Sequence, residues 1–232
     1  MGDSIIYEAP CLTNDQAALD SPPILNWVSE NHKMDKSPDQ TGIDKARSET
    51  LRKIGRNVVI FQKMEAMLKH LVAYGNMEGY MSDLEQVRTQ RSSSVARQPM
   101  GKLADAFVKS AYPRSARSEV TGPDDLAGPW VSFCFEVESA KEFRKERQKA
   151  LKAVVQERNK LIHQMLAHFD PGSLESCIQT ASELDRQKAT VMPEYRLLGS
   201  MMNALRSAHE ELIRWLDSGG MSAASDDQGG GP

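Results

Sequence analysis

Apolar residues recur every three or four positions between about residues 43 and 217, the period of amphipathic α-helices. The first helix is predicted over about 44–74 and ends before Gly75, a frequent helix terminator. Shorter helices are predicted over about 80–91 and 102–111. The buried face of the first helix is expected to contain seven residues at helical spacing: Leu51, Ile54, Val58, Phe61, Glu65, Leu68 and Val72.

A different pattern occupies residues 130–137, where apolar and polar residues alternate as in a β-strand. The sequence shows no convincing partner strand, so a short β-hairpin or an extended segment is expected. A long central helix follows over about 140–168, and Ser139 and Glu142 have the spacing of a capping box. Its predicted seam is two residues wide: Ala150, Leu151, Val154, Val155, Arg158, Asn159, Leu161, Ile162, Met165 and Leu166.

Turn residues at 170–172 separate this helix from the last part of the chain. Ser173 is expected to cap a further helix, and Pro193 to start the final one. The sequence therefore predicts an all-α fold, an antiparallel bundle of four to five helices over 43–217, with at most a short β-hairpin or extended segment near 130–137. Residues 1–42 are predicted to be a flexible segment and 218–232 a disordered tail.

Composition narrows the function without identifying it. The net charge is −3, which gives the chain as a whole no signature of nucleic-acid binding. Three cysteines, far apart in the sequence, predict neither a disulfide framework nor a zinc site, and no cofactor or metal is expected. No apolar run reaches the roughly 18 residues of a membrane span, and no secretory signal is evident, so a cytoplasmic protein is expected.

Polar residues interrupt two of the predicted apolar seams. Glu65 is the polar member of the first seam, and Arg158 and Asn159 interrupt the central one. An unpaired buried charge is costly, so we expect Glu65 to contact the group formed by Arg158, Asn159 and His163. The alternative is equally open at this point: such residues are often side chains that reach solvent, or polar residues that set helix register.

The spacing of these residues suggests half of a site. Asn159 and His163 are four apart and share one side of a helix, whereas Arg158 and His163 lie about 140° apart around it. Two copies facing each other in a dimer could bring two arginines and two histidines to one phosphate. Residues 141–160 contain eight cations and three acids, a local charge of 8 − 3 = +5 beside this motif.

The segment Arg158-Asn159-Lys160-Leu161-Ile162-His163 resembles the motif of the HEPN superfamily, an arginine followed by four to six residues and a histidine. In that family the residue after the arginine is typically Asn, Asp or His. No other arginine of this chain precedes a histidine at this spacing. An acidic residue in an earlier helix, here Glu65, also suits the family pattern.

The resemblance implies a metal-independent RNA endonuclease with a composite site in a homodimer. His163 would be the general acid and base, and Arg158 would stabilise the charge on the phosphorane. Asn159 would orient the histidine or the phosphate, and Glu65 would hold Arg158 in place. The RNA 2′-OH would be the nucleophile. Many such proteins are toxins or phage-defence effectors, often neutralised by a nucleotidyltransferase-type antitoxin.

The alternative is a non-catalytic helical bundle, HEPN-like or unrelated, that binds a partner or a nucleotide. The acidic net charge and the lack of a substrate-reading aromatic platform motivate it. In that case His163 is a core or interface histidine.

Overall fold

The computed structural model describes residues 38–113 and 128–218, and this part of the chain is mainly α-helical. Most of the predicted flexible segment and tail therefore lie outside the described residues, although residues 38–42 already belong to the first helix. The elements in chain order are α1 (Pro38–Tyr74), β1 (Asn76–Tyr80), α2 (Leu84–Ala96), α3 (Met100–Ala111), β2 (Trp130–Cys134), α4 (Lys141–Lys160), the π-helical turn η1 (Leu161–Met165), α5 (Leu166–His168) and α6 (Leu174–Asp217).

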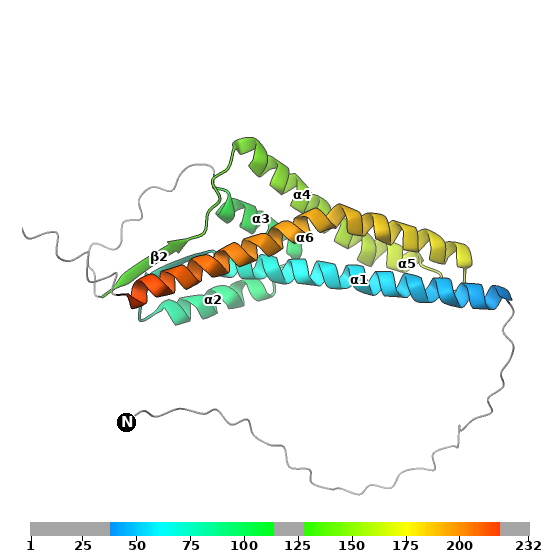
Figure 1. Cartoon of the computed structure of the whole chain (residues 1–232), viewed down its shortest axis with the longest axis horizontal. Helices are drawn as coiled ribbons and strands as arrows, with labels where there is room; N and C mark the ends of the chain where they lie inside the picture. Colours follow the sequence, from blue (N-terminus) through cyan, green and yellow to red (C-terminus); the bar gives the residue numbers. More distant parts are fainter. Residues whose placement is uncertain (1–37, 114–127, 219–232) are drawn as a thin grey trace, which may run out of the picture. The chain divides into compact units, whose positions relative to one another are not determined.

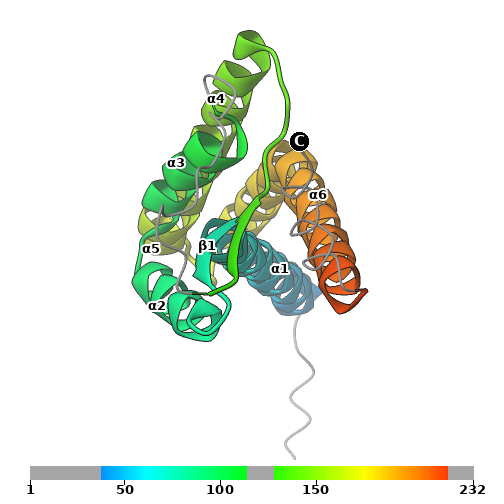
Figure 2. The ribbon, with the colours of Figure 1, turned by 90° about the vertical axis from the view of Figure 1, so that its left-hand side faces the viewer.

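Helix α1 is the central element, because it packs against α6, α2 and α3. Figure 2 shows α6 on one side of α1 and α2 and α3 on the other. The two longest helices run parallel, since Thr50 bonds to Cys177 and Asn57 to Leu184 (Figure 1). Helix α4 packs antiparallel to the first half of α6, as predicted, but the parallel pairing of α1 with α6 departs from the predicted antiparallel bundle. The all-α fold with a minor β component is confirmed.

The core consists mainly of Leu, Met, Val and Phe side chains from α1, α3, α4 and α6. On α1 the buried face is rotated from the predicted one, because Leu51 is exposed while Thr50 and Asn57 are buried. On α4 and η1 the fully buried stripe is one residue wide, and Val155 and Leu166 of the predicted second row are half-buried against it. It contains Leu151, Val154, Leu161 and Met165, whereas Ile162 is 37% exposed.

The strand predicted at 130–137 exists as β2, but its partner comes from far away in the sequence. It pairs antiparallel with β1, from Asn76 opposite Cys134 to Tyr80 opposite Trp130. The two strands form a two-stranded sheet that is not a local hairpin, because α2 and α3 lie between them in the chain. β1 was missed because Asn, Glu and Gly are poor strand formers.

Helix ends and breaks agree with the sequence in two places and differ in two. Gly75 ends α1, and a Cβ there would lie 2.5 Å from the carbonyl oxygen of Leu71. Ser173 caps α6, because its Oγ accepts a hydrogen bond from the amide of Ser176. The predicted capping box of the central helix does not form, since α4 starts after Ala140 without a side-chain cap.

Pro193 does not start a new helix, because it lies inside α6, a single helix of 44 residues. Val191, Glu194 and Leu198 on either side of Pro193 are all buried, so the core holds both halves of α6. Pro193 itself is exposed, and the carbonyl that loses its amide partner can bind water. Figure 1 shows α6 bent near its middle, as a proline inside a helix predicts.

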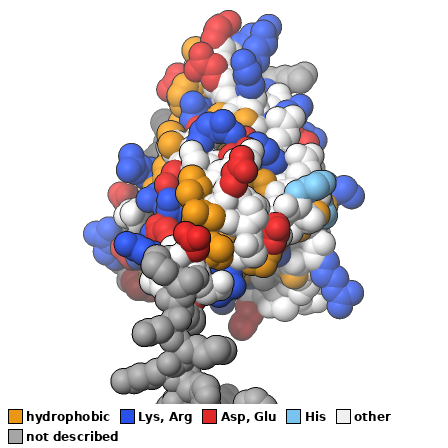
Figure 3. All heavy atoms as spheres, turned by 90° about the vertical axis from the view of Figure 1, so that its right-hand side faces the viewer, with side chains coloured by type: hydrophobic (Ala, Val, Ile, Leu, Met, Phe, Trp, Pro, Cys, Tyr) orange, Lys and Arg blue, Asp and Glu red, His pale blue; other side chains and the backbone are white. Residues whose placement is uncertain are grey.

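The end of the bundle where α1 begins carries a mixed surface. Figure 3 shows exposed hydrophobic side chains there among side chains of both charge signs. Leu51, Leu174 and Ile178 are the exposed large hydrophobic residues of this region. None of the helices in the described part of the chain combines the length and apolar character needed to cross a bilayer.

Candidate functional site

The predicted motif straddles a change of helix type. Arg158 and Asn159 belong to the last turn of α4, and His163 lies in the π turn η1. The amide of Leu166 donates to the carbonyl of Leu161, an i to i+5 hydrogen bond that defines the wider turn. Such π turns are rare and occur frequently at functional sites. The wider turn brings residues five apart nearer to one side than the 140° of an ideal α-helix.

A buried glutamine of α6 supports this junction. The Gln187 side-chain amide donates to the carbonyl of Glu157 at 2.9 Å, and its nitrogen lies 3.9 Å from Met165 Sδ. Its oxygen accepts from Asn57 at 3.0 Å. Gln187 is 2% exposed, so its contacts hold the turn from both ends against α6 and α1.

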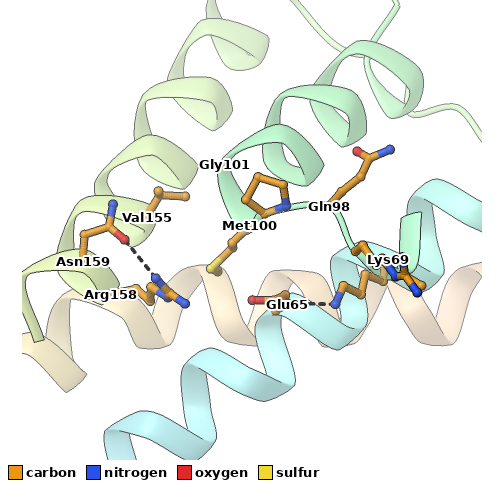
Figure 4. A pocket seen from close by; sticks show the side chains of 11 residues that line it. Glu65, Lys69, Gln98, Met100, Gly101, Val155, Arg158 and Asn159 are labelled. Atoms are coloured by element: carbon orange, nitrogen blue, oxygen red, sulfur yellow. Dashed lines mark hydrogen bonds and ion pairs between the residues drawn. The ribbon is translucent and has the colours of Figure 1, made fainter. Parts of the chain in front are cut away.

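Arg158, Asn159 and Glu65 line one pocket of about 440 Å³. Figure 4 shows Arg158 and Asn159 entering it from α4, and Glu65 and Lys69 from α1. The sequence thus correctly placed Glu65 near the Arg158-Asn159 pair, although these residues are separated by more than ninety positions in the chain.

The contacts inside the pocket differ from those expected. Glu65 forms its ion pair with Lys69 at 2.8 Å, one helical turn further along α1, and not with Arg158. Arg158 Nη1 donates to Asn159 Oδ1 at 3.2 Å. Among the described residues Arg158 has no carboxylate partner, so its charge remains available to a ligand. The expectation that Glu65 holds Arg158 was therefore wrong.

His163 lies apart from the pocket. Its side chain is exposed and is not among the pocket's lining residues. Within the described part of the chain it makes no hydrogen bond. Arg158 therefore lines the pocket and His163 does not, and the described residues show no contact of Glu65 with His163.

The pocket also contains residues that sequence reasoning missed, contributed by the connection between α2 and α3. These are Ala96, Arg97, Gln98, Pro99, Met100 and Gly101. Helix α3 begins here with Pro99 as its N-cap, which provides no side-chain hydrogen bond. The first amides of a helix lack partners inside it and carry partial positive charge. Pro99 before an apolar periodic run was the available signal, since proline is common at helix starts.

The electrostatic balance of the pocket is positive. Arg158, Arg97 and Lys69 are its cations, and Glu65 is its only acid. The start of α3 adds to this charge. A pocket with this balance can bind a phosphate or another anion.

Among the described residues, no group of three or more His, Cys, Asp or Glu side chains is arranged so that it could hold a metal ion. Comparisons of the chain with protein-family models, curated proteins and solved structures found no match.

Proposed function

We propose that this protein is a metal-independent RNA endonuclease of the HEPN type that acts as a homodimer. The observation that carries the proposal is the placement of the motif: Arg158 and Asn159 line a positively charged pocket, while His163 remains exposed on the adjoining π turn. A histidine that served only the core would be buried, whereas His163 is exposed. An arginine that only reached solvent would not line a pocket, as Arg158 does.

The chemistry is transfer of the phosphate to the neighbouring ribose hydroxyl. The RNA 2′-oxygen attacks the adjacent phosphorus and the bond from phosphorus to the 5′-oxygen breaks, which leaves a 2′,3′-cyclic phosphate and a 5′-hydroxyl. His163 removes the proton from the 2′-OH or supplies one to the leaving 5′-oxygen. In a dimer, the two copies of His163 can divide these two roles.

Arg158 stabilises the negative charge that develops on the phosphorane. Asn159, whose amide oxygen already accepts from Arg158, orients the guanidinium or the phosphate. Glu65 fixes Lys69 at the floor of the pocket by their ion pair, instead of holding Arg158.

The test is cleavage of a labelled single-stranded RNA by the purified protein in EDTA. We expect fragments that end in a 2′,3′-cyclic phosphate, and no cleavage of DNA. His163→Ala should abolish cleavage with an unchanged circular dichroism spectrum. His168→Ala is the matched control, because His168 is also exposed and bonds the carbonyl of Gln164 in its own helix. Equal activity of the His163 variant and wild type would reject the assignment.

A second candidate is a non-catalytic bundle that binds a nucleotide or a protein partner. The separation of His163 from the Arg158 pocket within one chain favours it. It predicts a monomer that binds mononucleotides in the pocket, measured by calorimetry, without cleaving RNA. Loss of that binding in Arg158→Gln would support it.

The biological role that accompanies the first proposal is that of a toxin or phage-defence effector, with a nucleotidyltransferase-type antitoxin as partner. This role comes from the resemblance of the motif alone. Expression of the protein should then arrest growth, and His163→Ala should not. Coexpression of a nucleotidyltransferase encoded beside it should restore growth.

A further inference from the structure

A second hollow adjoins the Arg158 pocket along α1 and α2. That hollow has a volume of about 420 Å³ and shares Lys69 and Ala96 with the first pocket. The residues of α1 that line the two hollows extend from Glu65 to Tyr74. Nine residues of helix span about 13.5 Å, several times the roughly 3.4 Å rise of a stacked nucleotide.

The second hollow contains an aromatic pair. The rings of His70 and Tyr74 are 4.5 Å apart between centroids and tilted by 53°. The Arg88 guanidinium carbon lies 6.0 Å from the centre of the Tyr74 ring. His70 is exposed, whereas Tyr74 is half-buried.

The two adjoining hollows, taken together as one groove from Arg158 to Tyr74, carry charges of one predominant sign. Lys69, Arg97 and Arg158 line it, and Glu65 is the only acid in either lining. Although His70 is exposed, partial desolvation of its ring lowers its pKa below the ordinary value, and His209 acts in the same direction. His70 therefore presents a neutral ring at neutral pH, and the groove's charge comes from lysine and arginine.

We propose that the groove from Arg158 to Tyr74 binds a single strand of RNA, with its phosphates on Lys69, Arg97 and Arg158 and one base stacked on His70. This inference rests on the proposed ribonuclease function and adds a base-binding subsite to it. Cations that follow a strand beside an aromatic stacking surface are the general means of binding single-stranded nucleic acid. An acidic protein segment would use the cations and would not need the ring pair.

The experiment measures binding separately from cleavage. Full-length His163→Ala protein is titrated into a short fluorescein-labelled single-stranded RNA, and the dissociation constant is obtained from fluorescence anisotropy. A second RNA carries 2-aminopurine, whose fluorescence falls when the base stacks. We expect saturable binding with quenching, and weaker binding to an RNA duplex, whose bases are already stacked.

Added to this background, His70→Ala should raise the dissociation constant about tenfold or more and remove the quenching. His70→Phe should keep both, because it retains a ring. His168→Ala is the matched control and should change the constant less than twofold. Lys69→Gln and Arg97→Gln should each reduce the slope of log K against log salt by about one.

The possible outcomes distinguish a failure of the RNA-binding groove from a failure of the proposed nuclease activity. Absence of RNA binding, or equal loss in the His70→Ala and His168→Ala proteins, would overturn the groove. Binding lost with Lys69→Gln but unaffected by His70→Ala would indicate a surface for acidic partners and also overturn it. RNA bound as expected, but left uncut by wild-type protein, would remove the proposed nuclease and leave the RNA-binding groove intact.

Discussion

The half-buried Arg147 of α4 and the buried Glu194 of α6 connect these helices by an ion pair of 2.7 Å. Glu194 is only 6% exposed, and burial raises its pKa while Arg147 opposes the shift. Arg147 also lies over the ring of Phe143, 5.1 Å from its centre. The pair shows how a charged side chain can belong to the core when its partner is present.

Replacement of Arg147 by Met would leave Glu194 buried without its cation. We expect the free energy of unfolding to fall by about 3–5 kcal/mol, measured by urea denaturation at pH 7. Lys145→Met, on an exposed position of the same helix, is the control and should change it by less than about 0.5 kcal/mol. A loss no larger in the Arg147 variant than in the control would contradict the role of the pair.

His209 gives the protein a predictable response to acid. Its ring lies 4.5 Å from that of Phe133, and burial lowers its pKa below the ordinary value of 6.5. The unfolded chain therefore binds a proton at His209 more readily than the folded protein does, and the free energy of unfolding falls as the pH drops below about 6.5. His70 contributes in the same direction.

The measurement compares wild type and His209→Phe by urea denaturation at pH 7.5 and 5.5. Wild type should lose more stability between these pH values than the variant, which has one protonation site fewer. Equal losses would show that His209 does not carry this pH dependence.

Individual residues also show which features of the site could and could not be predicted from the sequence. Arg158 and Asn159 were recognised because polar residues interrupt an apolar period, and the structure brings them to a pocket with Glu65. The buried Asn57 and Gln187 were missed, because periodicity cannot distinguish a polar residue that bonds across the core from one that faces solvent. The ion-pair partner of Glu65 could not be predicted from the sequence either, because both Lys69 and Arg158 were candidate cations for it.

At the level of elements, the π turn connects the core to the candidate site. Gln187 of α6 donates to the carbonyl of Glu157 in the last turns of α4, just before the π turn, and its side-chain nitrogen lies 3.9 Å from the Sδ of Met165 at the end of the π turn. The spacing of apolar residues does not predict a π turn, because Leu161 and Met165 are four residues apart, as in an α-helix. The pattern predicted the helix, and the tertiary hydrogen bond selects its local form.

Gln187→Leu should therefore affect stability and function together. The variant loses the hydrogen bonds from the Gln187 amide to the carbonyl of Glu157 and from Asn57 to the Gln187 oxygen, at a cost of about 1–3 kcal/mol of unfolding free energy. We also expect slower RNA cleavage at saturating RNA, since His163 shifts with the turn. Gln179→Leu, exposed on the same helix, is the control. Full cleavage by a destabilised Gln187 variant would separate the turn from the site.

Over the whole molecule, the helical fold followed from periodicity, but its topology did not. The parallel pairing of α1 with α6, and the antiparallel pairing of β1 with β2, which begins 50 residues after β1 ends, depend on contacts distant in sequence. Pro193 illustrates the same point, because buried residues on both sides of it outweigh the local preference for a break.

The proposed homodimer has a candidate contact surface beside His163. Ile162 is a large hydrophobic residue, 37% exposed, on the same π turn. Ile162→Glu should convert the dimer to a monomer in sedimentation velocity and reduce cleavage by at least tenfold. Ile178→Glu is the control, because Ile178 is more exposed, at 58%, and belongs to α6. An Ile162 variant that remains a fully active dimer would place the interface elsewhere.

The central claim is that this chain cuts RNA through the substrate's own 2′-OH without a metal. The most direct measurement uses an RNA with a strong cleavage position, and the same RNA with a single 2′-deoxyribose immediately 5′ of that phosphate, both in EDTA. We predict that cleavage disappears at that phosphate alone and continues at other sites, while His163→Ala cuts neither RNA. Cleavage that persists at the deoxy position, or that requires added magnesium, would contradict the account.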